Sequence, residues 1–392
     1  MPEAPKEKCG VLAVYMPGEE AARHAFYGIY ALQHRGQESA GIASAHSGRL
    51  YNHSGMGLVS QVFDETNLSY LPGDMAIGHT RYSTTGSTRL ENAQPVQVTG
   101  THGALALAHN GNLVNAEVLR ESMERSGYTF TSSTDTEAIA HMLASAPGAD
   151  WPERISTVMK LIKGAYCLVG MTPDFLFAMR DPYGIRPLCL GSLNGGYIVA
   201  SETCALDHLG ADFIREVQPG EAVIIDRDGL NSFQAVEPER NALCVFEFIY
   251  FSRPDSRMDG QLIYPARMAM GRELAREHPV EADIVIGVPD SAIAAAIGYA
   301  HESGIPYAEG LVKNRYVGRT FIQPDQRLRD QGVYLKFNPL PEVIGGKRLI
   351  VVDDSIVRGT TTPKVVDMLR RAGAAEVHLR VCSPPIRHPC HF

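Results

Sequence analysis

Residues 348–361 read Arg-Leu-Ile-Val-Val-Asp-Asp-Ser-Ile-Val-Arg-Gly-Thr-Thr. The apolar run 349–352 predicts a buried strand, and two carboxylates follow it directly. Small polar residues come next, and Pro363 lies where the first turn of a helix would begin. Strand, loop and helix in this order indicate a parallel sheet, in which ligands bind beyond the carboxyl ends of the strands.

The same alternation occurs upstream. Residues 284–288 are apolar and predict a strand, which Pro289-Asp290-Ser291 follows. An alanine-rich stretch then predicts a helix that ends near Ser303, where Gly304 is a typical stop signal. We therefore expect both polar loops to lie at the same edge of one sheet.

Adjacent carboxylates can bind sugar hydroxyls or position Mg²⁺, and backbone N–H groups at a helix N-terminus bind phosphate. No GxxxxGK[ST] motif is present, so this is not a P-loop. The plainer interpretation is an acidic strand end before a capped helix. The complete string instead resembles the phosphoribosyl pyrophosphate loop of type I phosphoribosyltransferases.

That resemblance implies roles for individual residues. Asp353 and Asp354 would contact the ribose hydroxyls and Mg²⁺, with Ser291 as a further metal ligand. Residues 313–321 resemble the flap that closes over the substrate. The remaining candidates for binding phosphoribosyl pyrophosphate are Ser355, Arg358, Gly359, Thr360 and Thr361 for the 5′-phosphate, and Asp290, Ser291, Lys313 and Arg315 for the pyrophosphate.

Four segments stand out in the first half of the chain. They are Cys9-Gly10-Val11, residues 79–86 (HTRYSTTG), residues 109–112 (HNGN) and residues 132–137 (SSTDTE). Taken singly, they suggest a buried thiol, a solvated arginine, a hairpin turn and a helix cap. Taken in order, they supply the groups that hydrolysis of an amide side chain requires.

Cys9 would be the nucleophile, and if it were the first residue its own α-amine could accept the thiol proton. Asn110 and the Gly111 N–H would stabilise the tetrahedral oxyanion. Arg81 suits the α-carboxylate of glutamine, because guanidinium groups bind carboxylates through two hydrogen bonds. Asp135 suits the α-ammonium group.

These segments, together with residues 31–41 (ALQHRGQESAG), resemble the glutaminase domain of the N-terminal-nucleophile amidotransferases. The resemblance implies a four-layer αββα fold and a catalytic Cys9, and it adds Arg35 to the glutamine pocket. It also implies that residues 1–8 are a propeptide, cut between Lys8 and Cys9.

A polar stretch at 237–241 separates the two halves. We expect a propeptide at 1–8, a glutaminase domain at 9–240 and a Rossmann-like, parallel-sheet type I phosphoribosyltransferase domain at 241–392. This combination implies that glutamine-derived ammonia passes through a sealed channel to phosphoribosyl pyrophosphate, giving 5-phosphoribosylamine, glutamate and pyrophosphate. That reaction is the first committed step of purine synthesis.

Cys244 and Cys390 match two of the four iron–sulfur ligands in one branch of this family. A [4Fe–4S] cluster normally requires four thiolates. The chain stops at Phe392, before the C-terminal helices of the family, which suggests either a fragment or a member that lacks them. A bound cluster and two free thiols therefore both stay open, as do a homodimer and a homotetramer.

Composition sets the outer limits on function. The chain has 392 residues and a net charge of -8, and its 36 Lys and Arg residues are scattered, which argues against nucleic-acid binding. Seven cysteines without close pairs, no signal peptide and no long apolar run predict a cytoplasmic protein that does not enter membranes.

Two rival functions remain to be weighed. A hexosephosphate aminotransferase would share the first half of the chain but lacks the string at 353–361. A ligand-sensing repressor built on the phosphoribosyltransferase fold would leave Cys9 and Asn110 without a role, and it would need a basic surface.

Overall fold

A computed structural model describes residues 9–82, 89–314, 336–357, 359–388 and 390. These residues fall into two compact units. The first contains residues 9–244, the short segment Arg257–Asp259 and Cys390; the second contains Val245–Ser256 and the described residues from Gly260 to His388. Each unit is described separately below.

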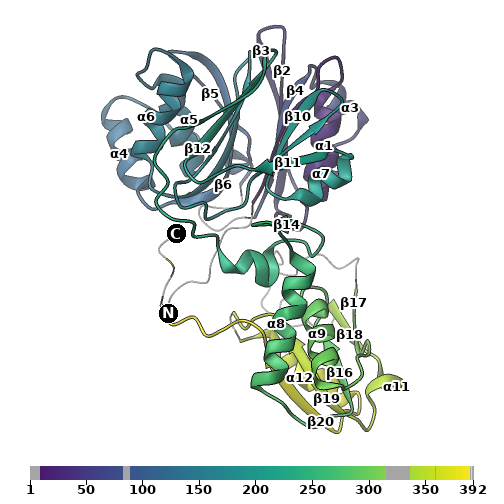
Figure 1. The fold of residues 1–392 in the computed structure, drawn as a ribbon. Helices are drawn as coiled ribbons and strands as arrows, with labels where there is room; N and C mark the ends of the chain where they lie inside the picture. Colours follow the sequence, from purple (N-terminus) through teal and green to yellow (C-terminus); the bar gives the residue numbers. More distant parts are fainter. Residues whose placement is uncertain (1–8, 83–88, 315–335, 358, 389, 391–392) are drawn as a thin grey trace. The chain divides into compact units, whose positions relative to one another are not determined.

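Two antiparallel sheets form the centre of the first unit (Figure 1). The seven-stranded sheet has the order β11 (Asp212–Glu216), β9 (Cys189–Leu193), β10 (Gly196–Ala200), β1 (Gly10–Tyr15), β4 (Met75–Arg81), β2 (Ser39–His46) and β3 (Arg49–Met56). The six-stranded sheet has the order β13 (Gly229–Gln234), β12 (Glu221–Asp226), β8 (Leu176–Arg180), β7 (Gly164–Met171), β6 (Gly103–Leu113) and β5 (Val96–Gly100).

Helices cover both outer faces of this pair of sheets (Figure 1). Helices α1 (Ala21–Ala31) and α7 (Thr203–Leu209) lie on the first sheet, and α5 (Asp135–Ser145) and α6 (Trp151–Leu161) on the second. The other helices of this unit are α2 (Val59–Val62), α3 (Glu65–Ser69), α4 (Ala116–Arg125) and the short η1 (Leu90–Asn92).

Strand β1 shows why four layers form. Leu12 and Val14 pack beneath the helices of the first sheet, whereas Val11 and Ala13 pack between the two sheets. Side chains alternate between the faces of a strand, so a strand that is apolar at every position needs cover on both faces. The αββα prediction is confirmed.

The second unit contains a parallel sheet in the order β16 (Ile284–Gly287), β19 (Arg348–Asp353) and β20 (Glu376–Val381). Apolar cores lie on both of its faces, one formed with α8 (Ile263–Glu277) and α9 (Ile293–Ser303), the other with α12 (Thr361–Arg371). The Rossmann-like prediction is confirmed. The remaining elements of this unit are η2 (Glu247–Phe251), β15 (Gln261–Leu262), β17 (Leu311–Lys313), β18 (Phe337–Pro339) and α11 (Pro341–Ile344), whereas β14 (Arg257–Met258) belongs to the first unit.

Two glycine positions show how local sequence and strand pairing set the backbone. Gly304 ends α9 in the left-handed conformation, with φ 72°, as its position predicts. The Asn110-Gly111 pair does not form a hairpin turn, because it lies within β6 and pairs with β7. Among the described residues, no helix is both long enough and apolar enough to cross a bilayer.

Candidate active sites

The first unit contains a pocket of about 470 Å³. Four predicted residues from separate segments line it: Cys9, Arg81, Gly111 and Asp135. They come from the residue before β1, the end of β4, the last part of β6 and the start of α5. Segments that are far apart in the sequence therefore supply one cavity.

Cys9 precedes β1, whose register with β4 pairs Gly10 with Thr80. The nucleophile candidate consequently lies beside Arg81, the last residue of β4. Its side chain is buried, and its Sγ lies 3.9 Å from the carbonyl oxygen of Tyr82. The thiol is thus held at the wall of the pocket.

Asn110 and Gly111 follow one another on β6. The Asn110 side chain is fully buried, and within the described part of the chain neither its oxygen nor its nitrogen has a hydrogen-bond partner. A buried amide of this kind is costly unless it serves a ligand. A Cβ at Gly111 would lie 2.0 Å from the carbonyl oxygen of Ala165, so only glycine fits there.

We expect Asn110→Leu to lower the turnover number for glutamine hydrolysis by about 10²–10³-fold, the usual cost of losing one oxyanion donor. Thermal stability should stay equal or rise, because the leucine replaces a buried amide that makes no hydrogen bond to described residues. Steady-state kinetics and thermal unfolding test this pair of results. A fall in stability that accounts for the lost activity would contradict it.

Asp135 has a partner that the sequence did not reveal. Its Oδ1 lies 3.2 Å from Nδ1 of His109, and its Oδ2 accepts a hydrogen bond from the Leu113 N–H at 3.0 Å. Burial opposes ionisation of Asp135, but the charge of His109 and these hydrogen bonds hold its pKa below the usual range. Asp135 is therefore an anion that faces the pocket.

His109 is itself held in place by two buried groups. The backbone N–H of His109 donates to Oε1 of Gln94 at 2.7 Å, and the backbone carbonyl oxygen of His109 lies 3.1 Å from Nε2 of His79. Burial lowers the pKa of His79 to about 3. The His79 ring is consequently neutral at physiological pH and donates to the strand that carries the oxyanion candidates.

The His79 pKa makes the first unit sensitive to acid. An unfolded histidine binds a proton below about pH 6.5, and the folded one does not, so its contribution to stability is lost as the pH falls from about 6.5 towards 3. We expect His79→Gln to flatten the pH dependence of the unfolding free energy by about 1.4 kcal/mol per pH unit in this window. Denaturant unfolding at pH 7.5 and 4.5 measures it; equal slopes would contradict it.

Arg35 does not line the pocket, and its side chain contacts the backbone of Cys9 instead. Its Nε donates to the Cys9 carbonyl oxygen at 3.0 Å, and its Nη1 lies 2.5 Å from Oε1 of Glu202. Glu202 received no role from the sequence. No motif marks it, and its partner lies 167 positions away.

In the second unit, the two predicted loops meet at the sheet edge. The Ser291 hydroxyl donates to Oδ2 of Asp354, and Asp290 forms an ion pair with Lys313. Ser355 Oγ donates to Oδ1 of Asp354 at 2.6 Å, and Thr360 and Thr361 open α12 after Gly359. Arg315 and Arg358 lie outside the described residues.

At this edge of the sheet, Asp353 has a strongly shifted pKa. Burial raises its pKa to about 7, and the charge of Asp354 adds to the effect. Two carboxylates that repel each other in this way suit a divalent cation. Mg²⁺ commonly uses one or two carboxylates together with substrate phosphates, so Asp353, Asp354 and Ser291 fit it.

The two cysteine candidates for an iron–sulfur cluster give a different result. Cys244 is half-buried and Cys390 is exposed, and both belong to the first unit. The described residues contain no group of three or more His, Cys, Asp or Glu side chains arranged to hold a metal. Cys244 and Cys390 are two of the four thiolates that a [4Fe–4S] cluster normally requires.

Comparison with known proteins gives a consistent picture. Residues 79–208 match the family model of the glutamine amidotransferase domain, and residues 262–383 match that of the phosphoribosyl transferase domain. The chain is 53% identical to an amidophosphoribosyltransferase of Synechococcus elongatus over all of its length and 80% of the relative's. It is 49% identical to the Bacillus subtilis amidophosphoribosyltransferase, covering 98% of this chain and 81% of the relative.

Solved structures agree with this. The glutamine phosphoribosylpyrophosphate amidotransferase of B. subtilis, complexed with ADP and GMP, superposes with a TM-score of 0.91 at 49% identity. That match covers 97% of this chain and 83% of the other. The two sites described above thus lie on a fold already known to carry both domains.

Proposed function

The chain belongs to the amidophosphoribosyltransferase family, and from this we propose how its own residues perform the reaction. Glutamine is hydrolysed at Cys9, and the ammonia is transferred to phosphoribosyl pyrophosphate to give 5-phosphoribosylamine, glutamate and pyrophosphate. One observation carries the first half: Cys9, Arg81, Gly111 and Asp135 line a single pocket.

In the proposed first half-reaction, cleavage after Lys8 frees the α-amine of Cys9. The amine accepts the thiol proton, and the thiolate attacks the side-chain amide carbon of glutamine. The Asn110 amide and the Gly111 N–H stabilise the oxyanion. The protonated amine then gives its proton to the leaving nitrogen, so ammonia departs and a thioester remains, which water hydrolyses to glutamate.

Two charged residues would orient the substrate in this pocket. Arg81 would bind the α-carboxylate of glutamine, and Asp135 its α-ammonium group. The depressed pKa of Asp135 supports this role, because an anion is needed at working pH. Arg35, which contacts the Cys9 carbonyl, would act on the nucleophile and not on glutamine.

In the second half-reaction, ammonia attacks the anomeric carbon of phosphoribosyl pyrophosphate and pyrophosphate leaves. Asp353 and Asp354 would hold the ribose hydroxyls, and with Ser291 they would hold Mg²⁺, which neutralises the charge of the pyrophosphate. The 5′-phosphate would lie at the start of α12, against Ser355, Arg358, Gly359, Thr360 and Thr361, while Asp290, Lys313 and Arg315 would face the pyrophosphate.

Some features of the proposal concern the whole chain. We place the domain boundary at 240/241 and the propeptide at residues 1–8, and we infer a cytoplasmic homo-oligomer that binds neither nucleic acid nor membranes. None of the proposed steps uses an iron–sulfur cluster.

The test is glutamate release from glutamine by the purified protein, with and without phosphoribosyl pyrophosphate and Mg²⁺. We expect release in both cases and a clear stimulation by phosphoribosyl pyrophosphate, because an uncoupled glutaminase would waste glutamine. Intact-mass analysis of the same sample should give a chain that begins at Cys9. An active protein that retains Met1 or Pro2 would refute the α-amine mechanism.

A further inference from the structure

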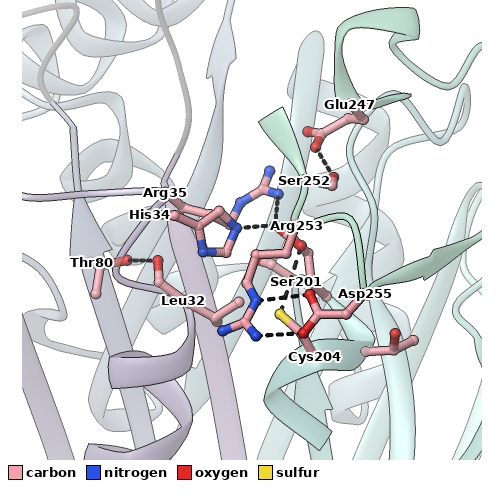
Figure 2. A network of polar contacts seen from close by, with 12 residues as sticks. Leu32, His34, Arg35, Thr80, Ser201, Cys204, Glu247, Ser252, Arg253 and Asp255 are labelled. Carbon is pink, nitrogen blue, oxygen red and sulfur yellow. Dashed lines mark hydrogen bonds and ion pairs between the residues drawn. The ribbon is translucent and has the colours of Figure 1, made fainter. Parts of the chain in front are cut away.

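Arg35 is among the largest fully buried side chains of the chain, with 1% of its surface exposed. It lies in the segment after α1, beside His34 (Figure 2). A buried guanidinium is stable only when an anion or several acceptors surround it. Here one N–H donates to the carbonyl oxygen of the nucleophile residue itself, at 3.0 Å.

Glu202 supplies the anion for this buried group. Its side chain is completely buried, and its Oε1 lies 2.5 Å from Arg35 Nη1 and 2.7 Å from His34 Nε2. Glu202 directly precedes α7 and its carboxylate makes no capping hydrogen bond; its Oε2 accepts a hydrogen bond from Cys204 Sγ at 3.7 Å. The carboxylate is directed instead at the segment that holds Arg35.

Glu202 is also fixed to the nucleophile's strand through its neighbour. The Val11 N–H donates to Ser201 Oγ at 2.9 Å, and the Ser201 N–H donates to the Val11 carbonyl at 3.0 Å. Ser201 and Val11 therefore tie the start of β1 to the end of β10. These contacts, which do not involve Arg35, fix the position of Glu202 relative to Cys9.

The segment carrying Arg35 is packed equally tightly on the pocket wall. Thr80 Oγ1 donates to the Leu32 carbonyl at 3.4 Å (Figure 2). A Cβ at Gly36 would lie 2.5 Å from the backbone of Thr80, so β4 approaches this segment directly. A movement of Arg35 would consequently displace both Cys9 and the end of β4.

We propose that Glu202 is a positioning residue for the nucleophile: it holds Arg35 so that the Arg35 Nε–H fixes the Cys9 carbonyl, and thereby the direction of the Cys9 amine and thiol. This inference rests on the proposed glutaminase function. Glu202 touches no substrate and acts only through Arg35. Its loss should therefore slow chemistry without weakening glutamine binding, since Arg81 and Asp135 stay in place.

The first test is Glu202→Gln, which keeps the shape and removes the charge. We expect the turnover number for glutamine hydrolysis to fall by about 10- to 100-fold, the scale that a displaced reacting group produces. The KM for glutamine should change by less than about twofold, because Arg81 and Asp135, which are proposed to bind glutamine, are unchanged. Synthesis of 5-phosphoribosylamine from free ammonia should stay unchanged, which reports on the second site in the same sample.

Glu221 provides a matched control. It is another buried carboxylate of the first unit, with Oε1 2.6 Å from Arg215 Nη2. Glu221→Gln should lower thermal stability as Glu202→Gln does, but leave glutamine turnover at the wild-type value. If both variants lose turnover in proportion to stability, or if Glu202→Gln changes only KM, the positioning role is wrong.

The second test separates positioning from simple charge pairing. In the double variant Arg35→Met/Glu202→Met, two apolar side chains replace the buried ion pair, an exchange that often preserves stability. Positioning predicts a folded protein whose glutamine turnover stays low; recovery to within about threefold of wild type would refute it. If Glu202→Gln does not fold, Glu202→Asp, which keeps the charge, is compared in its place.

The wild-type protein, assayed alongside these variants, distinguishes failure of the proposed glutaminase function from failure of the proposed role of Glu202. No glutamate release by the wild type would overturn the proposed function itself. Release by the wild type together with full turnover in Glu202→Gln would overturn only the role of Glu202.

Discussion

Cys9→Ala will abolish the formation of 5-phosphoribosylamine from glutamine, with a loss of about 10³-fold or more, because removal of a nucleophile leaves no alternative covalent route. Formation from free ammonia will continue. The two outcomes belong together: the pocket with Cys9 lies in the first unit, whereas Asp353 and Asp354 lie in the second. Both rates are measured by pyrophosphate release at saturating phosphoribosyl pyrophosphate.

Cys189→Ala is the matched control for this prediction. Cys189 is also a buried thiol of the first unit, but it lies on β9 and its Sγ contacts the Ala200 carbonyl. This variant should retain glutamine-dependent synthesis. Residual glutamine-dependent synthesis in Cys9→Ala above the contamination level, or equal losses in the two variants, would remove Cys9 from the mechanism.

Asp354→Asn will produce the opposite pattern. Synthesis should fall by about 10²–10³-fold with either nitrogen source, because the proposed site for Mg²⁺ and ribose loses a negative charge. Glutamate release measured without phosphoribosyl pyrophosphate should persist. The change keeps the side-chain shape, but Ser291 and Ser355 donate to different oxygens of Asp354, so the asparagine can accept only one of these two hydrogen bonds.

Asp283→Asn serves as the control for Asp354. Asp283 precedes β16 at the other end of the sheet, where it pairs with Arg348 at 3.1 Å and is exposed. Its loss should have little effect, as is usual for surface ion pairs. If Asp354→Asn retained ammonia-dependent synthesis, the second site would have to lie elsewhere in the chain.

The sequence predicted those parts of the molecule that depend on local pattern. Apolar runs at 284–288 and 349–352 gave the parallel strands, because a strand covered on both faces must be apolar throughout. The contact between Ser291 and Asp354 followed from topology, since the carboxyl ends of parallel strands share one edge. The helix after this loop, α12, begins at Thr361, two residues before the predicted start at Pro363, because helix ends depend on a few weak contacts.

Other features depended on partners that only folding brings together. The pairing of His109 with Asp135 and that of Glu202 with Arg35 join positions 26 and 167 residues apart. No periodicity marks such contacts. Asn110-Gly111, a dipeptide typical of hairpin turns when taken alone, lies instead within β6, where it pairs with β7.

The position of β1 between β10 and β4 has a consequence for the time course of synthesis on the ribosome. The ribosome releases the N-terminal end first, so Cys9 emerges long before Ala200, the β10 residue that pairs with Leu12. Glu202 emerges later still. The growing chain therefore carries Cys9, the proposed nucleophile, early but completes the surroundings of that residue only when the first unit is nearly finished.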